Sequence, residues 1–142
     1  MDIHEHQAKH ILAQFGIPVP KGNTAFTPEQ ASFIARQVGD GACVVKAQIH
    51  SGGRGEAGGV KVCKTENEAR EFAGSLLGTQ LVTKQTDANG KRIDRLWVEE
   101  VSDIERELYI GFVLDRKTER IMIVASGHGG MEIEDLAEED PD

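Results

Sequence analysis

The sequence predicts a mixed fold of helices and strands, of the α/β or α+β class, built as one lobe followed by the opening strands of a second. Short amphipathic helices alternate with short strands through the first 98 residues, and a hairpin with a glycine-rich tip lies at 43–63. A second hairpin pattern follows at 107–125. We therefore expect a first lobe at 1–98, a hinge at 99–106 and the start of a second lobe at 107–142.

Three helices are expected in the first lobe. Asp2 and Glu5 have capping-box spacing and open the first, which Gly16 and Pro18 end. The second and third helices open with the capping boxes Thr27–Gln30 and Thr65–Glu68. Apolar stripes at helical spacing support all three: Ala8, Ile11, Leu12 and Phe15; Ala31, Ile34, Ala35 and Val38; Ala69, Phe72, Ala73, Leu76 and Leu77.

Strands are expected around and between these helices. An extended piece at 23–26 precedes the second helix, and strands at 81–86 and 93–98 enclose a turn at 87–92. At 107–115 apolar residues alternate with others, and 121–125 supplies the partner strand of a second hairpin. Because a two-stranded hairpin cannot form its own core, we expect a truncated chain whose second lobe is incomplete.

The central hairpin is the strongest candidate for a binding site. Alternation along the first strand places Lys46 on the face opposite Cys43, Val45 and Ala47, which form a wholly apolar face. A lysine buried in the middle of a strand requires an anion nearby. The tip at 52–59 holds five glycines in eight positions, so its backbone can approach a ligand closely and turn N–H groups toward a phosphate.

Two interpretations of this hairpin remain open on the residues alone. One is a site for a polyphosphate nucleotide, with the glycine loop over the phosphates and Lys46 beneath them. The other is an ordinary mobile hairpin tip with a lysine that extends to solvent. The loop is neither a Walker loop nor a dinucleotide fingerprint, because no Gly-Lys-Thr/Ser follows and it leads to a strand.

Composition and charge exclude several classes of function. The formal net charge is -8, but seven of the 24 acidic residues lie after Met131, which leaves 17 against 16 basic residues in the body. A nearly neutral body shows no basic surface for nucleic acid. No apolar run reaches the roughly 20 residues that span a bilayer, so we expect no membrane association and a cytoplasmic location. Cys43 and Cys63 are interpreted as core residues rather than a disulfide.

Two carboxylates near the predicted hinge complete the nucleotide hypothesis. An ionised carboxylate accepts hydrogen bonds from ribose hydroxyls or a base amino group. Glu99 comes directly after the last strand of the first lobe, and Glu107 lies on the strand face opposite Leu108 and Ile110. The alternative for Glu107 is a solvated strand residue.

Six segments, in order, resemble the amino-terminal part of the β subunit of ADP-forming acid–CoA ligases, the succinyl-CoA synthetases and malate–CoA ligases. They are HEHQAKHIL, VVKAQIHSGGRGEAGG, LVTKQTDANG, WVEE, ERELYIGFVLDR and GGMEIE. The resemblance covers essentially the whole chain and implies the ATP-grasp fold. It also implies a reaction in which ATP, with Mg²⁺, phosphorylates a histidine of a partner α subunit. The phosphoryl group then passes to a dicarboxylic acid, and coenzyme A captures the acyl phosphate.

The resemblance also implies roles for individual residues. Lys46 would contact the α and β phosphates, and Gly53, Arg54 and Gly55 would form the loop over them. The remaining candidates are Glu99 and Ser102 at the adenine hinge and Glu107 at the ribose. No catalytic residue and no magnesium ligand is expected within these 142 residues, so the chain alone should be inactive.

The sequence departs from the family pattern in the glycine loop. The family usually has a basic residue after Gly55, and here the residue is Glu56, which should weaken phosphate binding unless it points to solvent. The residues do not distinguish succinate from malate or ATP from GTP. Two other interpretations remain: a different ATP-grasp carboxylate ligase, and a nucleotide-binding fragment without chemistry.

Overall fold

The structure, a computed structural model, describes residues 2–130. The acidic tail and the end of the expected second lobe, at 131–142, lie outside the described residues. The elements follow the order α1 (Glu5–Gln14), β1 (Gly22–Ala25), α2 (Pro28–Gly39), β2 (Cys43–Ala47), β3 (Val60–Cys63), α3 (Glu66–Leu76), β4 (Gln80–Leu81), β5 (Lys91–Arg92), β6 (Leu96–Glu99), β7 (Tyr109–Asp115) and β8 (Arg120–Ser126). The predicted mixture of helices and strands is confirmed.

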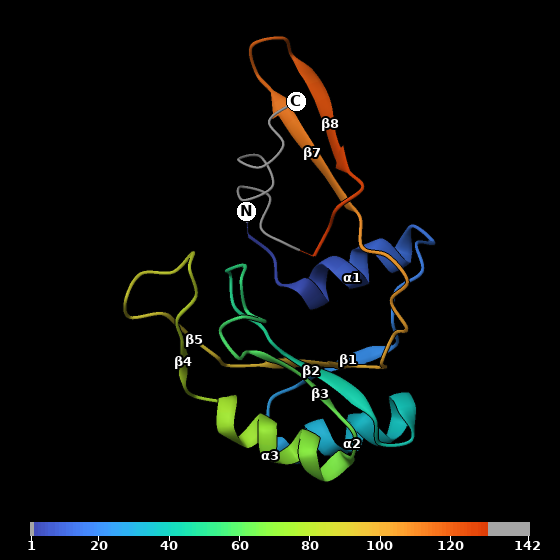
Figure 1. Cartoon of the computed structure of the whole chain (residues 1–142), viewed down its shortest axis with the longest axis vertical. Helices are drawn as coiled ribbons and strands as arrows, with labels where there is room; N and C mark the ends of the chain where they lie inside the picture. Colours follow the sequence, from blue (N-terminus) through green and yellow to red (C-terminus); the bar gives the residue numbers. More distant parts are fainter. Residues whose placement is uncertain (1, 131–142) are drawn as a thin grey trace. The chain divides into compact units, whose positions relative to one another are not determined.

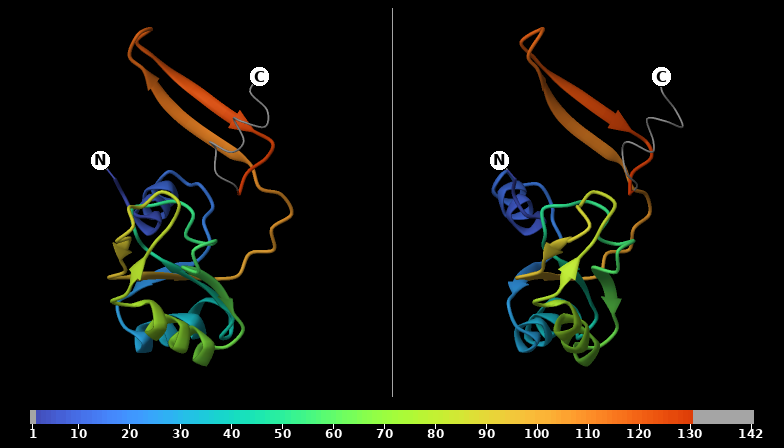
Figure 2. Two further views of the ribbon diagram at one scale, coloured as in Figure 1. Left: turned by 60° about the vertical axis from the view of Figure 1, so that its left-hand side comes forward. Right: turned by 90° about the vertical axis from the view of Figure 1, so that its left-hand side faces the viewer.

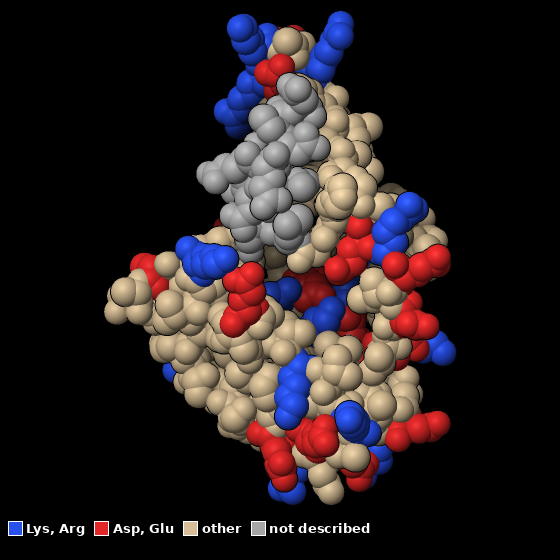
Figure 3. Space-filling view, viewed as in Figure 1, with Lys and Arg blue, Asp and Glu red and all other residues tan. Residues whose placement is uncertain are grey.

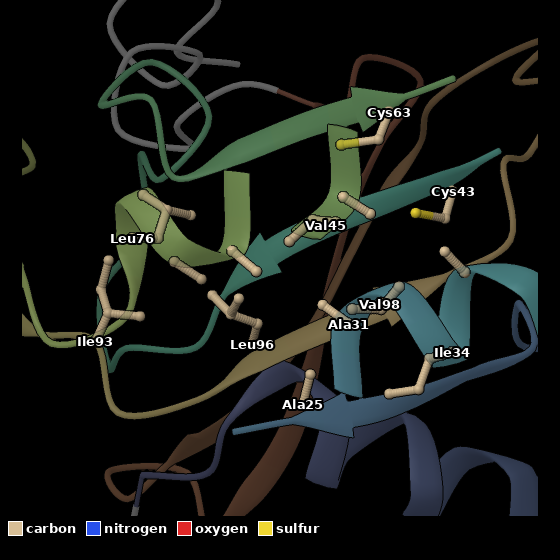
Figure 4. Close-up of a cluster of buried hydrophobic side chains, with 14 of the residues drawn as sticks. Ala25, Ala31, Ile34, Cys43, Val45, Cys63, Leu76, Ile93, Leu96 and Val98 are labelled. Atoms are coloured by element: carbon tan, nitrogen blue, oxygen red, sulfur yellow. The ribbon is translucent and has the colours of Figure 1, made fainter. Parts of the chain in front are cut away.

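A four-stranded antiparallel sheet of order β1-β6-β2-β3 forms the centre of the first unit, which ends at Ser102. Helices α2 and α3 lie side by side on one face of this sheet, and α1 lies on the other face (Figures 1 and 2). The alternation predicted for β2 is confirmed, because Cys43, Val45 and Ala47 are fully buried. Figure 4 shows core side chains of β2 and β6 directed toward α2 and α3.

The two cysteines meet inside this core. Cys43 on β2 is directly opposite Cys63 on β3, and both are free and buried (Figure 4). Burial raises the pKa of the Cys43 thiol to about 12, so the reactive thiolate is disfavoured. The interpretation of both residues as parts of the core is confirmed.

Local sequence signals explain where α2 and α3 begin. The Thr27 hydroxyl accepts a hydrogen bond from the Gln30 backbone N–H at 3.2 Å, and the Thr65 hydroxyl accepts one from Glu68 at the same distance. Each cap satisfies one of the N–H groups that a helix start leaves unpaired. Both predicted caps are confirmed.

The predicted start of α1 is wrong. His4, not Asp2, is the N-cap residue, and its backbone N–H donates to the Gln7 side chain at 2.8 Å. The reason is that Glu5, the expected box partner, turns toward the sheet and pairs with cations there. The apolar stripe of α1 lies on the outside of the unit, where Phe15 is 79% exposed.

The predicted strand at 81–86 is also wrong beyond Leu81. The Thr86 hydroxyl accepts from the Thr83 backbone N–H at 3.0 Å, and the Thr86 N–H donates to the Thr83 carbonyl at 3.2 Å. These local bonds close a turn and take the backbone groups that a sheet would use. The neighbouring strands shift as well, because β5 occupies part of the predicted turn and β6 begins at Leu96.

The second unit begins at Asp103, and its described part contains the β7–β8 hairpin. Its strands pair from Tyr109 opposite Ser126 to Asp115 opposite Arg120. Apolar side chains along both strands are exposed in the described residues, including Phe112 at 68% and Ile121 at 71%. The hairpin at 107–125 is thus confirmed, whereas the hinge boundaries stay a prediction.

Candidate nucleotide-binding site

Strand β2 presents Lys46 on the sheet face opposite the apolar core. Its neighbours along the strand, Val45 and Ala47, are fully buried on the core face. Because successive side chains of a strand alternate, Lys46 points toward the face that α1 covers. Its side chain is 22% exposed.

Strand β6 brings a carboxylate and an indole to the same face. In the antiparallel register, Lys46 is opposite Trp97, and Glu99 is two residues further along β6. The Lys46 ammonium lies 2.6 Å from Glu99 Oε1. The Trp97 indole N–H donates to Glu99 Oε2 at 2.6 Å. Glu99 is only 3% exposed, and its two oxygens accept from several donors.

Helix α1 completes a network of charges. Glu5 Oε1 lies 3.1 Å from the Lys46 ammonium and 3.0 Å from the Lys9 ammonium. Lys9 also pairs with Glu99, so each of these two ammonium groups bridges both carboxylates. The anions that make burial of Lys46 tolerable in this structure are therefore carboxylates of the protein. Figure 3 shows basic and acidic side chains together in the region between α1 and the sheet.

The glycine-rich loop joins the same network through Arg54. One guanidinium nitrogen donates to Glu5 Oε2 at 2.7 Å, and another donates to the Ala47 carbonyl at 2.6 Å. The loop backbone turns back on itself, because the Gly59 N–H donates to the Arg54 carbonyl at 2.7 Å. Gly53 has a φ of 66°, which favours glycine, and a Cβ at Gly59 would lie 2.6 Å from Leu81.

These contacts fix the charge state of the network. Burial alone would raise the pKa of Glu5, but Lys46, Lys9 and Arg54 lower it to about 2. Burial opposes ionisation of Glu99 as well, and hydrogen bonds from Lys46, Lys9 and Trp97 hold the pKa below its usual value. For Lys46, burial lowers the pKa and the two carboxylates raise it, with a net increase. At neutral pH Glu5, Glu99 and Lys46 are therefore charged.

A cavity of about 600 Å³ opens beside this network. Its walls include Glu5, His50, Gly52 and Arg54, and its volume is in the range of small-molecule sites. Lys46 is not part of the wall and contacts the other oxygen of the Glu5 carboxylate. The Glu5 carboxylate therefore lies between two cations. The Arg54 guanidinium lines the cavity, and the Lys46 ammonium does not.

Aromatic stacking holds the start of α1 next to the cavity. The His4 and His50 rings are stacked with centroids 4.0 Å apart, and His6 stacks on Trp97 at 6.2 Å. Burial and the neighbouring His50 and Arg95 lower the pKa of His4 to about 4. His4 is thus neutral at physiological pH, so the stack carries no repulsion between two imidazolium ions.

The structure brings some of the predicted site residues together. Lys46, Arg54 and Glu99 belong to one network, and Gly53 and Gly55 flank Arg54 in the loop. Their predicted contacts with nucleotide stay predictions. The geometry adds one fact, which is that both Glu99 oxygens already accept hydrogen bonds from Lys46, Lys9 and Trp97.

The other two predicted residues are not members of this network. Ser102 is exposed at the end of the first unit. Glu107 belongs to the second unit, where its carbonyl accepts from the Gly129 N–H at 3.1 Å. Its carboxylate lies so close to Gly130 that a Cβ there would collide with it. Gly130 has a φ of 76°, a conformation that favours glycine, and its lack of a Cβ leaves room for the Glu107 carboxylate.

Glu56, the departure from the family pattern, points away from the network. Its carboxylate lies 3.1 Å from the Lys84 ammonium, and the two side chains are 69% and 66% exposed. At that exposure an ion pair contributes at most about 1 kcal/mol. The acidic side chain therefore faces solvent in this structure, which is the arrangement least harmful to an anion at Lys46.

Sequence reasoning missed Glu5, Lys9 and Trp97. The signal for the first two was present, because they are four residues apart on one helix face and have opposite charges. Trp97 shares a strand face with Glu99, which alternation along 96–99 indicates. Within residues 2–130, no group of three or more His, Cys, Asp or Glu side chains is placed to hold a metal ion.

A family model for the ATP-grasp domain matches residues 2–142. The chain therefore belongs to the ATP-grasp family. The predicted fold and the predicted family resemblance are confirmed.

Named relatives of this family include β subunits of CoA ligases. The chain is 57% identical to a probable malate–CoA ligase subunit beta from Mesorhizobium japonicum over 141 residues, 99% of this chain and 36% of that relative. It is 53% identical to the succinate–CoA ligase [ADP-forming] subunit beta from Bacillus thuringiensis over 142 residues, 100% of this chain and 37% of that relative. The chain thus spans little more than a third of the length of these curated relatives.

Solved structures with the same fold include two structures of an acetyl-coenzyme A synthetase 1. An acetyl-coenzyme A synthetase 1 from Ca. Korarchaeum cryptofilum, described in complex with coenzyme A, Ca-AMPCP and HgCl⁺, has a TM-score of 0.66 and 26% identity, covering 88% of this chain and 54% of that one. A phosphoribosylamine–glycine ligase from Thermotoga maritima has a TM-score of 0.59 and 18% identity, covering 86% of this chain and 27% of that one. The second likeness shows the fold alone.

Proposed function

We propose that this chain is the nucleotide-binding part of the β subunit of an ADP-forming acid–CoA ligase. The observation that carries the proposal is the match of the whole chain to β subunits of succinate–CoA and malate–CoA ligases. The network at Lys46 supports it, because a lysine and an arginine next to a glycine-rich loop are suited to bind phosphates.

In the proposed reaction the β subunit holds ATP while the γ-phosphoryl group passes to a histidine of an α subunit, leaving ADP. The phosphoryl group then passes to succinate or malate, and the thiol of coenzyme A displaces phosphate from the acyl phosphate. We propose that the enzyme is cytoplasmic and takes part in the tricarboxylic acid cycle.

No helix within residues 2–130 is long and apolar enough to cross a membrane.

Each residue of the site has a proposed task. Lys46 and Arg54 offset the negative charge of the phosphates, and backbone N–H groups of 53–55 add hydrogen bonds. Glu99 is proposed at the adenine hinge, and its 2.6 Å ion pair also positions the Lys46 ammonium. Ser102 and Glu107 are proposed to contact the adenine and the ribose. Mg²⁺ would offset charge on the phosphates, and we propose, from the family resemblance, that its protein ligands are not among these 142 residues.

A coupled assay tests this proposal. The complete β subunit, assembled with its α subunit, is supplied with either succinate or malate, with ATP or GTP, and with coenzyme A and Mg²⁺. We expect continued turnover to nucleoside diphosphate only when an acid and coenzyme A are both present, because without them histidine phosphorylation releases at most one equivalent. This chain without its partner should hydrolyse no ATP above background. Turnover by this chain alone, or no reaction with either acid, would contradict the proposal.

A further inference from the structure

The Glu5 carboxylate occupies a position between two cations that the proposed function assigns to phosphate binding. One oxygen lies 3.1 Å from the Lys46 ammonium, and the other lies 2.7 Å from a guanidinium nitrogen of Arg54. A carboxylate that bridges two cations in this way has the charge and the hydrogen-bonding pattern of a phosphate oxygen pair, since both are acceptors only.

The cavity beside the network indicates the side from which an anion would approach the Glu5 carboxylate. Arg54 and Glu5 line the cavity, and Lys46 does not. An anion that enters the cavity therefore meets Arg54 and the Glu5 carboxylate before it can reach the Lys46 ammonium. Glu99 lies on the strand side, 2.6 Å from Lys46, and can hold that lysine in place after Glu5 has moved.

The charges around Glu5 favour an exchange of one anion for another. Three cationic side chains, Lys9, Lys46 and Arg54, face the two carboxylates. A phosphate added next to Glu5 would bring like charges together, so binding of the phosphate and the present position of Glu5 oppose each other. If Glu5 withdraws, the phosphate pairs with Lys46 and Arg54, and Lys9 keeps its ion pair with Glu99.

We propose that the Glu5 carboxylate is an internal counter-anion. It occupies the position of the phosphate oxygens until the polyphosphate of the nucleotide displaces it. This inference rests on the proposed function and adds a residue of α1 to its site. Glu5 keeps Lys46 and Arg54 paired while no ligand is bound, and it sets the affinity for phosphates by competing with them. It does not touch the reacting atoms.

Isothermal titration calorimetry on the assembled ligase tests the inference with ADP and adenosine as ligands. We expect Glu5→Gln to tighten ADP binding about tenfold, because a competing negative charge is removed, and to leave adenosine binding unchanged. Glu5→Asp keeps the charge but is too short to bridge both cations, so it should tighten ADP binding by a smaller factor. Glu29→Gln is the matched control, since Glu29 pairs with Arg70 on the outside of α2, and it should change neither affinity.

The outcomes separate this inference from the function on which it rests. Weaker or unchanged ADP binding in both Glu5 variants, or an equal gain for adenosine, would overturn the role of Glu5. Because Glu5→Gln removes a partner of three cations, Glu5→Asp provides the result if the first variant does not fold. If Lys46→Ala leaves ADP binding unchanged, the phosphate site lies elsewhere and the proposed function itself fails.

Discussion

Lys46→Ala in the complete ligase is expected to lower nucleotide-dependent turnover by about 10²-fold or more. The substitution removes the charged phosphate contact that we propose for Lys46, in a site that is largely shielded from water. Arg54 and the loop backbone remain, so residual activity should persist. The measurement is kcat/KM for ATP in the coupled assay, with ADP affinity measured separately by calorimetry.

The matched control for this variant is Lys61→Ala. Lys61 lies on the same hairpin, but it is opposite Val45 in the register and its ammonium lies over the Phe72 ring at 5.6 Å. It therefore belongs to the other face of the sheet. We expect Lys61→Ala to keep nearly normal kcat/KM. Near-normal turnover of Lys46→Ala, with an unchanged melting temperature, would show that Lys46 does not bind phosphates.

Glu99→Ala is expected to destabilise the first unit by about 3–5 kcal/mol. The substitution leaves the Trp97 indole N–H without its acceptor and leaves Lys9 and Lys46 with Glu5 as their remaining carboxylate. This loss is a large share of the roughly 5–15 kcal/mol that stabilises an ordinary domain. Urea unfolding followed by circular dichroism measures it without relying on Trp97 fluorescence, which the substitution itself alters.

Glu100→Ala is the control for Glu99, because its carboxylate accepts from the Lys21 backbone N–H at the surface, at 2.9 Å. We expect it to cost about 1 kcal/mol or less. A double variant tests whether the loss comes from a buried charge without its partner. Lys46→Met combined with Glu99→Leu removes both charges, so it should be less destabilised than Glu99→Ala. Equal stability of Glu99→Ala and Glu100→Ala would show that the buried network contributes little to folding.

Local patterns in the sequence predicted the parts of the fold that local forces control. Thr27 and Thr65 cap their helices as expected, because a hydroxyl three residues before a free N–H acts within one turn. Alternation along β2 placed Lys46 on the face opposite the core, since the pleat of a strand has period two. These predictions need no knowledge of the rest of the chain.

The predictions that failed concern residues for which distant or competing partners exist. Glu5 fits a capping box by spacing, but its partners Lys46 and Arg54 are 41 and 49 positions away. Spacing along a helix gives the face of a residue and not the element that the face meets. Similarly, Thr83 and Thr86 suit a strand by propensity, and their side chains close a turn instead.

The candidate site was predictable in part for the same reason. Lysine in a strand followed by a glycine-rich loop indicates an anion, and alternation indicates the face on which it lies. That the anions in this structure are the carboxylates of Glu5 and Glu99 could not be predicted, because both come from elements that are far from the loop in sequence.

The most direct measurement is a crystal structure of the assembled ligase with a nonhydrolysable ATP analogue. We expect the triphosphate next to the Lys46 ammonium and under the backbone of 53–55, with the Glu5 carboxylate withdrawn from Lys46 and Arg54. An analogue bound away from this hairpin, with Lys46 still bridging Glu5 and Glu99, would contradict a phosphate site at Lys46.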